Sequence, residues 1–174
     1  CCETNLGNYY QTGNCYGVPS FLLDDCSVLC SATGYVDKVS PLKTANLNMI
    51  NSFLSLGNNN HVGLIAYNTE VISIMSSDLT SDQNVLNNIV NSWEAKDSTC
   101  FCCAINEAKT RMLAQSQNTN KIFVLMSDGL PTDKCGGSDA TADAIASAQA
   151  AMSEIPGLII HTIDVGTDSQ ILRD

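Results

Sequence analysis

The sequence predicts an α/β fold: a mainly parallel central sheet with one antiparallel edge strand and helices on both faces. Three observations predict it. Apolar runs of strand length alternate with segments of helical spacing along residues 18–174. The run Ile122–Met126 is apolar at every position, which suits a strand covered on both faces. The link Asn68-Thr69 is too short for a parallel crossover, which needs about ten residues or more, so one strand pair is expected to be antiparallel.

The first half of the chain is expected to supply three strands and a long helix. Val18–Asp25 is predicted to be the first strand, because its apolar run is closed by two aspartates. A helix is expected from Ser40, a good N-cap, to the stop at Gly57. Val62–Tyr67 is the second predicted strand, and Val71–Met75 is the predicted antiparallel edge strand.

The second half continues the alternation of helices and strands. Asp82 is predicted to cap the next helix, and Pro156-Gly157 to end the last complete one. Residues 1–17 have no clear period and are expected to form an irregular, cysteine-rich arm ahead of one domain over residues 18–174. The expected elements are helices over 85–93, 104–114 and 142–155, strands over 121–128 and 158–165, and a further helix beginning at Ser169.

Charge and hydropathy exclude several classes of partner. The net charge is −10, from 18 acidic and 8 basic residues, which disfavours nucleic acid and anionic membranes. No apolar run approaches the roughly 20 residues that span a bilayer, so membrane insertion is not expected. The chain opens on Cys1-Cys2 without a visible signal peptide, which indicates a mature or trimmed segment of a longer precursor.

Nine cysteines indicate an oxidising compartment, and therefore a secreted, extracellular protein. The alternative is zinc ligation in the cytosol, but a pair of Cys-x-x-Cys knuckles is missing and Cys100-Phe101-Cys102-Cys103 is too tight to resemble one. Because nine is odd, at least one thiol is free or bonded to another chain. The disulfide candidates are Cys1, Cys2, Cys15, Cys26, Cys30, Cys100, Cys102, Cys103 and Cys135.

Several short motifs, in a fixed order, resemble the von Willebrand factor type A domain. They are Asp25-Cys26-Ser27, Val62–Asn68, a loop at Thr99, Val124–Gly129 and Ile163–Asp168. The resemblance covers residues 18–174 and implies a Rossmann-like sheet with helices on both faces. Members of this family normally continue with another strand and a closing helix, so these are expected to be missing from a chain that stops at residue 174.

The resemblance also implies a metal-ion-dependent adhesion site at the carboxyl edge of the sheet. Its ligands would be Asp25, Ser27, Thr99 and Asp128. Mg²⁺, or Mn²⁺ or Ca²⁺ in its place, suits such oxygen donors and would keep a position for an acidic side chain of a partner. The sequence departs from the family pattern at Leu29, which cannot bind a metal. The alternative is that the site is non-functional and that the two aspartates only terminate strands.

Six cysteines fall in three loops that such a fold brings to the same edge as the metal site. Disulfides are therefore expected to link the loops at this edge, although buried, unpaired cysteines are the alternative. Cys102 and Cys103 are expected to bond to different partners, because a disulfide between adjacent residues is strained. The six are Cys26, Cys30, Cys100, Cys102, Cys103 and Cys135.

The function expected from these observations is an extracellular protein-interaction or adhesion module that binds an acidic group of a partner through a divalent metal. The alternative is a disulfide-stabilised building block of an extracellular filament or matrix, with a non-functional metal site. In either case the partner is a protein or another copy of the chain, with a covalent link through an unpaired cysteine as one route. An enzyme is not expected, because no nucleophile is found beside a base.

Overall fold

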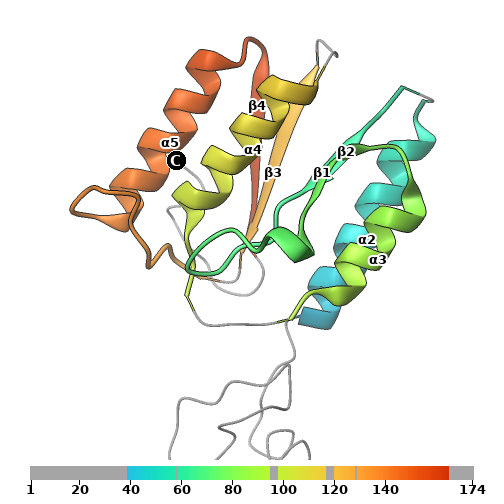
Figure 1. Cartoon of the computed structure of the whole chain (residues 1–174), viewed down its shortest axis with the longest axis horizontal. Coiled ribbons are helices and arrows are strands. Elements are labelled where there is room, and N and C mark those ends of the chain that lie inside the picture. Colours follow the sequence, from blue (N-terminus) through green and yellow to red (C-terminus); the bar gives the residue numbers. More distant parts are fainter. Residues whose placement is uncertain (1–38, 58, 95–97, 117–119, 128, 165–174) are drawn as a thin grey trace, which may run out of the picture.

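The computed structural model describes residues 39–57, 59–94, 98–116, 120–127 and 129–164 of the 174-residue chain. Helices and strands alternate along these residues, which confirms the predicted α/β class (Figure 1). In chain order the elements are α2 (Val39–Ser55), β1 (Val62–Leu64), the 3₁₀ helix η2 (Ser73–Met75), β2 (Ser77–Thr80), α3 (Gln83–Ser92), α4 (Phe101–Gln115), β3 (Lys121–Ser127), α5 (Ala140–Glu154) and β4 (Leu158–Asp164).

The described strands pair into two sheets of two strands each. β3 and β4 are parallel, with Lys121 opposite Leu158 at one end and Ser127 opposite Asp164 at the other. β1 and β2 are antiparallel, and an antiparallel bridge joins Tyr67 to Val71 across the short link, as that link predicted. The predicted first strand, 18–25, lies outside the described residues, as do the amino-terminal arm and the helix expected from Ser169.

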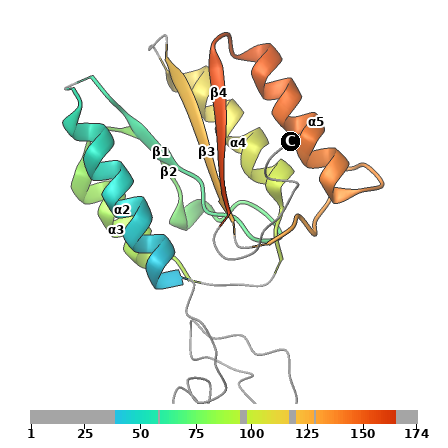
Figure 2. The same ribbon diagram turned by 180° about the vertical axis from the view of Figure 1, so that it is seen from behind.

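Helices lie on both sides of these strands (Figures 1 and 2). α2 and α3 pack side by side, and α3 contacts both strands of the hairpin; α4 and α5 pack side by side over β3 and β4. Each half has its own hydrophobic cluster. Phe101, Ile105 and Phe123 lie at the centre of the cluster beneath α4 and α5, whereas Ile50 and Leu86 lie in the cluster between α2, α3 and β1.

The helix starts follow from local capping. The Asp82 carboxylate accepts the amide protons of Asn84 (2.9 Å) and Val85 (3.3 Å), which confirms the predicted cap of α3. Asp139 caps α5 in the same way through the amide of Ala142 (2.8 Å). The N-cap predicted at Ser40 is wrong, because Ser40 already lies within α2.

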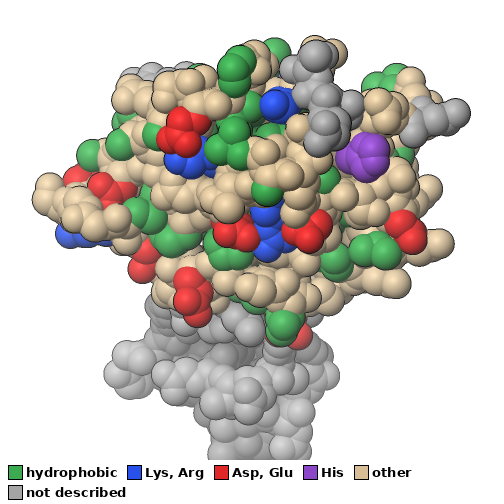
Figure 3. Space-filling view, turned by 45° about the horizontal axis from the view of Figure 1, so that its top comes forward, with side chains coloured by type: hydrophobic (Ala, Val, Ile, Leu, Met, Phe, Trp, Pro, Cys, Tyr) green, Lys and Arg blue, Asp and Glu red, His purple; other side chains and the backbone are tan. Residues whose placement is uncertain are grey.

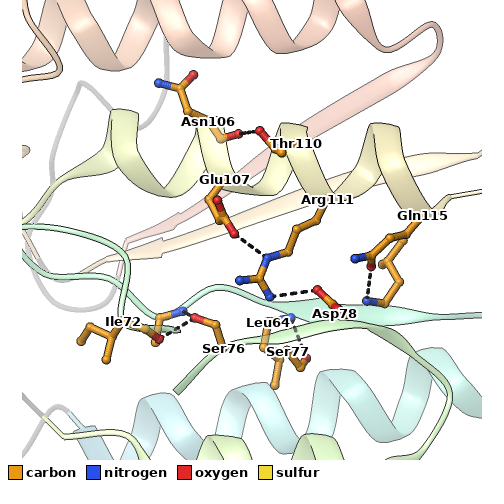
Figure 4. Close-up of polar contacts among 12 residues, drawn as sticks. Leu64, Ile72, Ser76, Ser77, Asp78, Asn106, Glu107, Thr110, Arg111 and Gln115 are labelled. Atoms are coloured by element: carbon orange, nitrogen blue, oxygen red, sulfur yellow. Dashed lines mark hydrogen bonds and ion pairs between the residues drawn. The ribbon is translucent and has the colours of Figure 1, made fainter. Parts of the chain in front are cut away.

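The edge strand lies further along the chain than predicted. Val71–Met75 was expected to be this strand, but residues 73–75 form η2 and the strand covers Ser77–Thr80. Beside η2 the two segments are joined by backbone and side-chain bonds together. The amide of Ile72 donates to the Ala66 carbonyl (2.8 Å), and the amides of Leu64 and Ala66 donate to Ser77 Oγ (3.1 Å) and Ser76 Oγ (2.9 Å) (Figure 4).

Polar contacts join α4 to the edge strand β2 (Figure 4). The Arg111 guanidinium lies between Glu107 Oε1 (2.7 Å) and Asp78 Oδ1 (3.3 Å). One turn further on, the amide of Leu79 donates to Gln115 Oε1 (2.9 Å). The hairpin is therefore held against α4 on one side and against α3 on the other.

A cavity of about 1160 Å³ separates the two sheets. Residues of β1, β3, α2 and α4 line it. Two polar contacts cross it at one end, since the Tyr67 hydroxyl donates to the Met126 carbonyl (2.8 Å) and Asn46 Nδ2 lies 3.1 Å from Met126 Sδ. On β3, Ile122 and Val124 keep 39% and 36% of their surface exposed, so coverage of both strand faces, which the apolar run predicted, is not complete in the described structure.

On the face of the described residues that Figure 3 shows, the charged side chains do not form a patch of one sign. On the face in Figure 3, acidic side chains are separated by neutral ones, and several lie beside Lys or Arg. Among the described residues, no helix is long and apolar enough to cross a membrane.

Candidate functional site

The structure describes one of the four predicted metal ligands, Thr99. Asp25, Ser27 and Asp128 lie outside the described residues. Thr99 is partly buried and directly precedes Cys100, the N-cap of α4.

The backbone of Thr99 is fixed by the segment that follows β3. Its amide donates to Thr132 Oγ1 (2.9 Å) and to Asp133 Oδ2 (3.2 Å). Its carbonyl oxygen accepts the amides of Thr132 (2.9 Å) and Asp133 (3.3 Å). The side-chain hydroxyl of Thr99 takes part in none of these four bonds. The structure therefore brings the Thr99 loop beside the loop after β3, as the predicted site requires of these two segments.

The carboxylate of Asp133 is the shared acceptor in this contact between the Thr99 loop and the loop after β3. Its Oδ2 accepts from the Ser98 hydroxyl, from Thr132 Oγ1 (3.0 Å) and from the Thr99 amide. Hydrogen bonding by Ser98 lowers the pKa of Asp133 from its ordinary value, and Thr132 and Thr99 act in the same direction. Ser98 has a positive φ of 79°, so the chain turns sharply just before Thr99.

Sequence reasoning did not identify Asp133 as a site residue. A signal was present, because Thr132-Asp133 follows the carboxyl end of a parallel strand, the criterion that selected Asp128. What the sequence did not show is that this carboxylate is used by three hydrogen bonds within the protein.

A third loop joins the same edge. The turn at Asn68 follows β1, and its carbonyl oxygen accepts the amide of Cys100 (2.7 Å). The ring of Tyr67, the preceding residue, packs edge-on against Phe101 at 6.1 Å between ring centres. The start of α4 is thus fixed from two directions, by the loop after β1 and by the loop after β3.

Four cysteines lie at this junction and form two disulfides. Cys100 is bonded to Cys103, and Cys102 is bonded to Cys135 in the loop after β3. The adjacent residues Cys102 and Cys103 bond to different partners, as predicted. The remaining candidates, Cys1, Cys2, Cys15, Cys26 and Cys30, lie outside the described residues.

The loop that carries Cys135 is also attached to α5. The Asp143 carboxylate, in the first turn of that helix, accepts the amides of Cys135 (2.6 Å) and Gly137 (2.9 Å). Cys135 is therefore held covalently to α4 and by hydrogen bonds to α5, so this loop has a fixed position over the end of β3.

The oxygen-rich half of the junction and its sulfur-rich half differ in what they can bind. Ser98, Thr99, Thr132 and Asp133 offer hydroxyl and carboxylate oxygens, which suit hard cations such as Mg²⁺. Oδ2 of Asp133 is already used, so a metal here would need the further oxygen donors predicted from the sequence. Those donors, Asp25, Ser27 and Asp128, are all of the hard type, and the set as a whole fits Mg²⁺ or Ca²⁺.

Comparison with known proteins gives one family and several related folds. A sequence model of the von Willebrand factor type A domain matches residues 21–131. The pilus adhesin SpaC from Lactobacillus rhamnosus GG has a similar structure, with a TM-score of 0.60 and 18% identity over 72% of this chain and 22% of SpaC. No curated protein sequence matches the chain.

Two further solved structures share the fold. An aerotolerance-related membrane protein from Bacteroides fragilis NCTC 9343 gives a TM-score of 0.52 and 20% identity over 69% of this chain and 55% of that protein. The vWF domain of the type V pili tip protein Mfa5 from Porphyromonas gingivalis gives a TM-score of 0.50 and 19% identity over 67% of this chain and 44% of that protein. The chain therefore spans between about a fifth and about half of the length of these proteins.

Proposed function

This chain belongs to the von Willebrand factor type A domain family, and on that basis we propose that it is an extracellular protein-interaction or adhesion module. The observation that carries the proposal is the convergence of three loops, after β1, before α4 and after β3, on one edge of the fold. Loops held in this way, by the Cys102–Cys135 disulfide and by hydrogen bonds, would bind a partner with little further ordering cost. Two of the similar folds belong to pilus proteins, which supports a place at a cell surface or outside the cell.

The proposed contact is a divalent metal held by Asp25, Ser27, Thr99 and Asp128, with an acidic side chain of the partner completing its coordination. Thr99 supports this role because its backbone is fixed while its hydroxyl lies outside the four fixing bonds. When bound, the ion would supply positive charge at an edge of an otherwise acidic chain of net charge −10.

The cavity between the sheets supports the proposed position of Asp25 at this edge. Residues 18–25 are predicted to form a strand, and the cavity is lined by strands β1 and β3 and by helices α2 and α4. In the proposed arrangement this segment lies there parallel to β3. Its carboxyl end would then reach the edge at which Ser127 ends β3, and Thr99 lies beside the loop that follows.

A second function is favoured by specific observations. Leu29 removes one oxygen from the family pattern, and the Cys102–Cys135 disulfide already joins two of the loops that a metal would otherwise hold. The odd cysteine count leaves at least one thiol for a bond to another chain. In this version the domain is a building block of an extracellular filament or matrix, and its metal site is non-functional. Neither version includes catalysis.

Metal titration separates the two versions. The melting temperature and binding heat of the full chain are measured with Mg²⁺, Mn²⁺ and Ca²⁺ at millimolar concentration. A working site raises the melting temperature, because the ion binds the folded chain; at 100 times Kd the stabilisation is about 2.7 kcal/mol. Thr99→Ala should abolish the rise, whereas Thr110→Ala, on the exposed side of α4, should leave it intact.

The absence of both heat and melting shift in the native chain would overturn the metal contact. In that case non-reducing gels test the building-block version, which requires covalent ladders that collapse on reduction. A native chain that binds no metal and forms no ladder would contradict both versions.

A further inference from the structure

The four cysteines at the start of α4 form a more compact group than two disulfides require. The sulfur atoms of Cys100, Cys102, Cys103 and Cys135 all lie within 4.8 Å of one another. Between the two bonds, Cys100 Sγ is 3.6 Å from Cys102 Sγ and 3.8 Å from Cys135 Sγ. Cys103 Sγ is 3.7 Å from Cys135 Sγ. The sequence places one of these residues more than thirty positions from the other three, so folding creates the group.

These separations match a tetrahedral metal site. A zinc ion bound by four thiolates has Zn–S distances of about 2.3 Å, which puts any two sulfurs about 3.8 Å apart. Three of the sulfur–sulfur distances already have this value, and opening the two disulfides lets the bonded pairs move to it. The sequence alone disfavours zinc ligation, because the cysteines at 100–103 are too closely spaced to resemble a Cys-x-x-Cys zinc knuckle. The structure adds Cys135 as the fourth donor.

The surroundings favour the negative charge that such a site carries. Zn²⁺ with four thiolates has a net charge of −2, and Cys100 is the N-cap of α4, with Cys102 and Cys103 in its first turn. The amino end of a helix attracts negative charge. The amide of Cys103 already donates to Cys100 Sγ (3.3 Å), the kind of outer contact that orients a metal ligand. Cys100 and Cys102 are buried, which excludes competing water from half of the group.

We propose that the reduced form of this group binds one Zn²⁺ through Cys100, Cys102, Cys103 and Cys135. Each disulfide takes two electrons and two protons from a dithiol reductant, which becomes a disulfide itself. The four resulting thiols release four protons as their sulfurs bind the ion. Metal and disulfides exclude each other, so zinc would hold the start of α4 to the loop after β3 before the chain is oxidised, and oxidation would release it.

Zinc protection of individual cysteines tests the proposal on the native full chain. The chain is reduced with a dithiol, freed of reductant without oxygen, loaded with one equivalent of Zn²⁺ and alkylated. Peptide mass spectrometry then locates the alkylated residues. The expected result is protection of the four named cysteines and alkylation of Cys1, Cys2, Cys15, Cys26 and Cys30. Protection of a different set, or of none, would overturn the proposal.

A second measurement uses Co²⁺ as a spectroscopic probe. Four thiolates around Co²⁺ give intense thiolate-to-metal absorption with the visible bands of a tetrahedral ion. Cys135→Ser should remove one thiolate and weaken metal binding by at least about tenfold. Tenfold is the smallest loss of metal affinity expected when only an outer contact of a ligand is removed, and loss of a ligand itself should cost no less. Cys15→Ser is the matched control and should change neither spectrum nor affinity. Equal weakening by both variants would contradict the assignment.

Discussion

Thr99 and Asp133 hold each other reciprocally: the Thr99 amide donates to Asp133 Oδ2 at 3.2 Å, and the Asp133 amide donates to the Thr99 carbonyl at 3.3 Å. One residue precedes α4 and the other follows β3, so this pair fixes two loops that are 34 positions apart in sequence.

Asp133→Asn should loosen the Thr99 loop and lower the melting temperature at neutral pH. The hydrogen bonds from Ser98, Thr132 and Thr99 lower the pKa of Asp133 in the folded chain, so its ionised form stabilises the fold above the unfolded-state pKa. This contribution is lost as the pH falls through the lower, folded-state pKa. The difference between native chain and variant should therefore shrink in acid. Glu94→Gln, which removes an exposed carboxylate, is the control and should lower the melting temperature at neutral pH less than Asp133→Asn does.

Asp82→Ala should destabilise the chain by about 1 kcal/mol, because it removes the side-chain acceptor for two amides of α3. Asp82→Asn keeps an acceptor oxygen and should restore most of that loss. Urea denaturation followed by circular dichroism measures both. An alanine variant as stable as the native chain would show that water satisfies the two amides equally well.

The two disulfides should differ in their contribution to stability. Cys102–Cys135 spans 33 positions and Cys100–Cys103 spans 3, and the loop-entropy relation gives about 4 and about 2 kcal/mol. Replacing Cys102 and Cys135 together by serine should therefore lower the free energy of unfolding more than the paired replacement of Cys100 and Cys103. The reverse order, in denaturation under metal-free conditions, would show that local strain outweighs loop closure.

Residues 18–25 should behave as a protected strand if they occupy the cavity between the sheets. Hydrogen exchange should then be slow at the amides of residues 20–24. Phe21→Asp would in that case place a charge among apolar cavity walls and should lower the melting temperature strongly. Ile74→Asp places the same charge at a side chain that is 85% exposed and should have little effect. Rapid exchange at residues 20–24 would rule out the proposed position.

The parts of the fold that could be predicted are those decided by nearby residues. The cap at Asp82 needs only its own side chain and the next two amides, so the sequence displays it. β3 and β4 are marked by apolar runs that end at polar residues. The edge strand was misplaced because Ile72 and Ile74 made 71–75 look like a strand, whereas hydroxyl groups of Ser76 and Ser77 decide the pairing.

The site was predictable as a meeting of loops but not as a set of contacts. The order of motifs identified Thr99, and strain excluded a bond between Cys102 and Cys103. The partners of these cysteines, and the part played by Asp133, depend on which loops approach and at what distance. Such long-range information is absent from local patterns, and several pairings of the cysteines satisfy the same sequence.

The bond between Cys102 and Cys135 encloses nearly all of α4 and the whole of β3 in one covalent ring. If the chain is pulled along its backbone, tension crosses at the sulfur atoms and the enclosed segment carries no load. About 110 Å of extended backbone, at roughly 3.4 Å for each of the 33 intervening steps, is thereby withheld from stretching. A single-molecule pulling trace should lengthen by that amount only after a reductant is added.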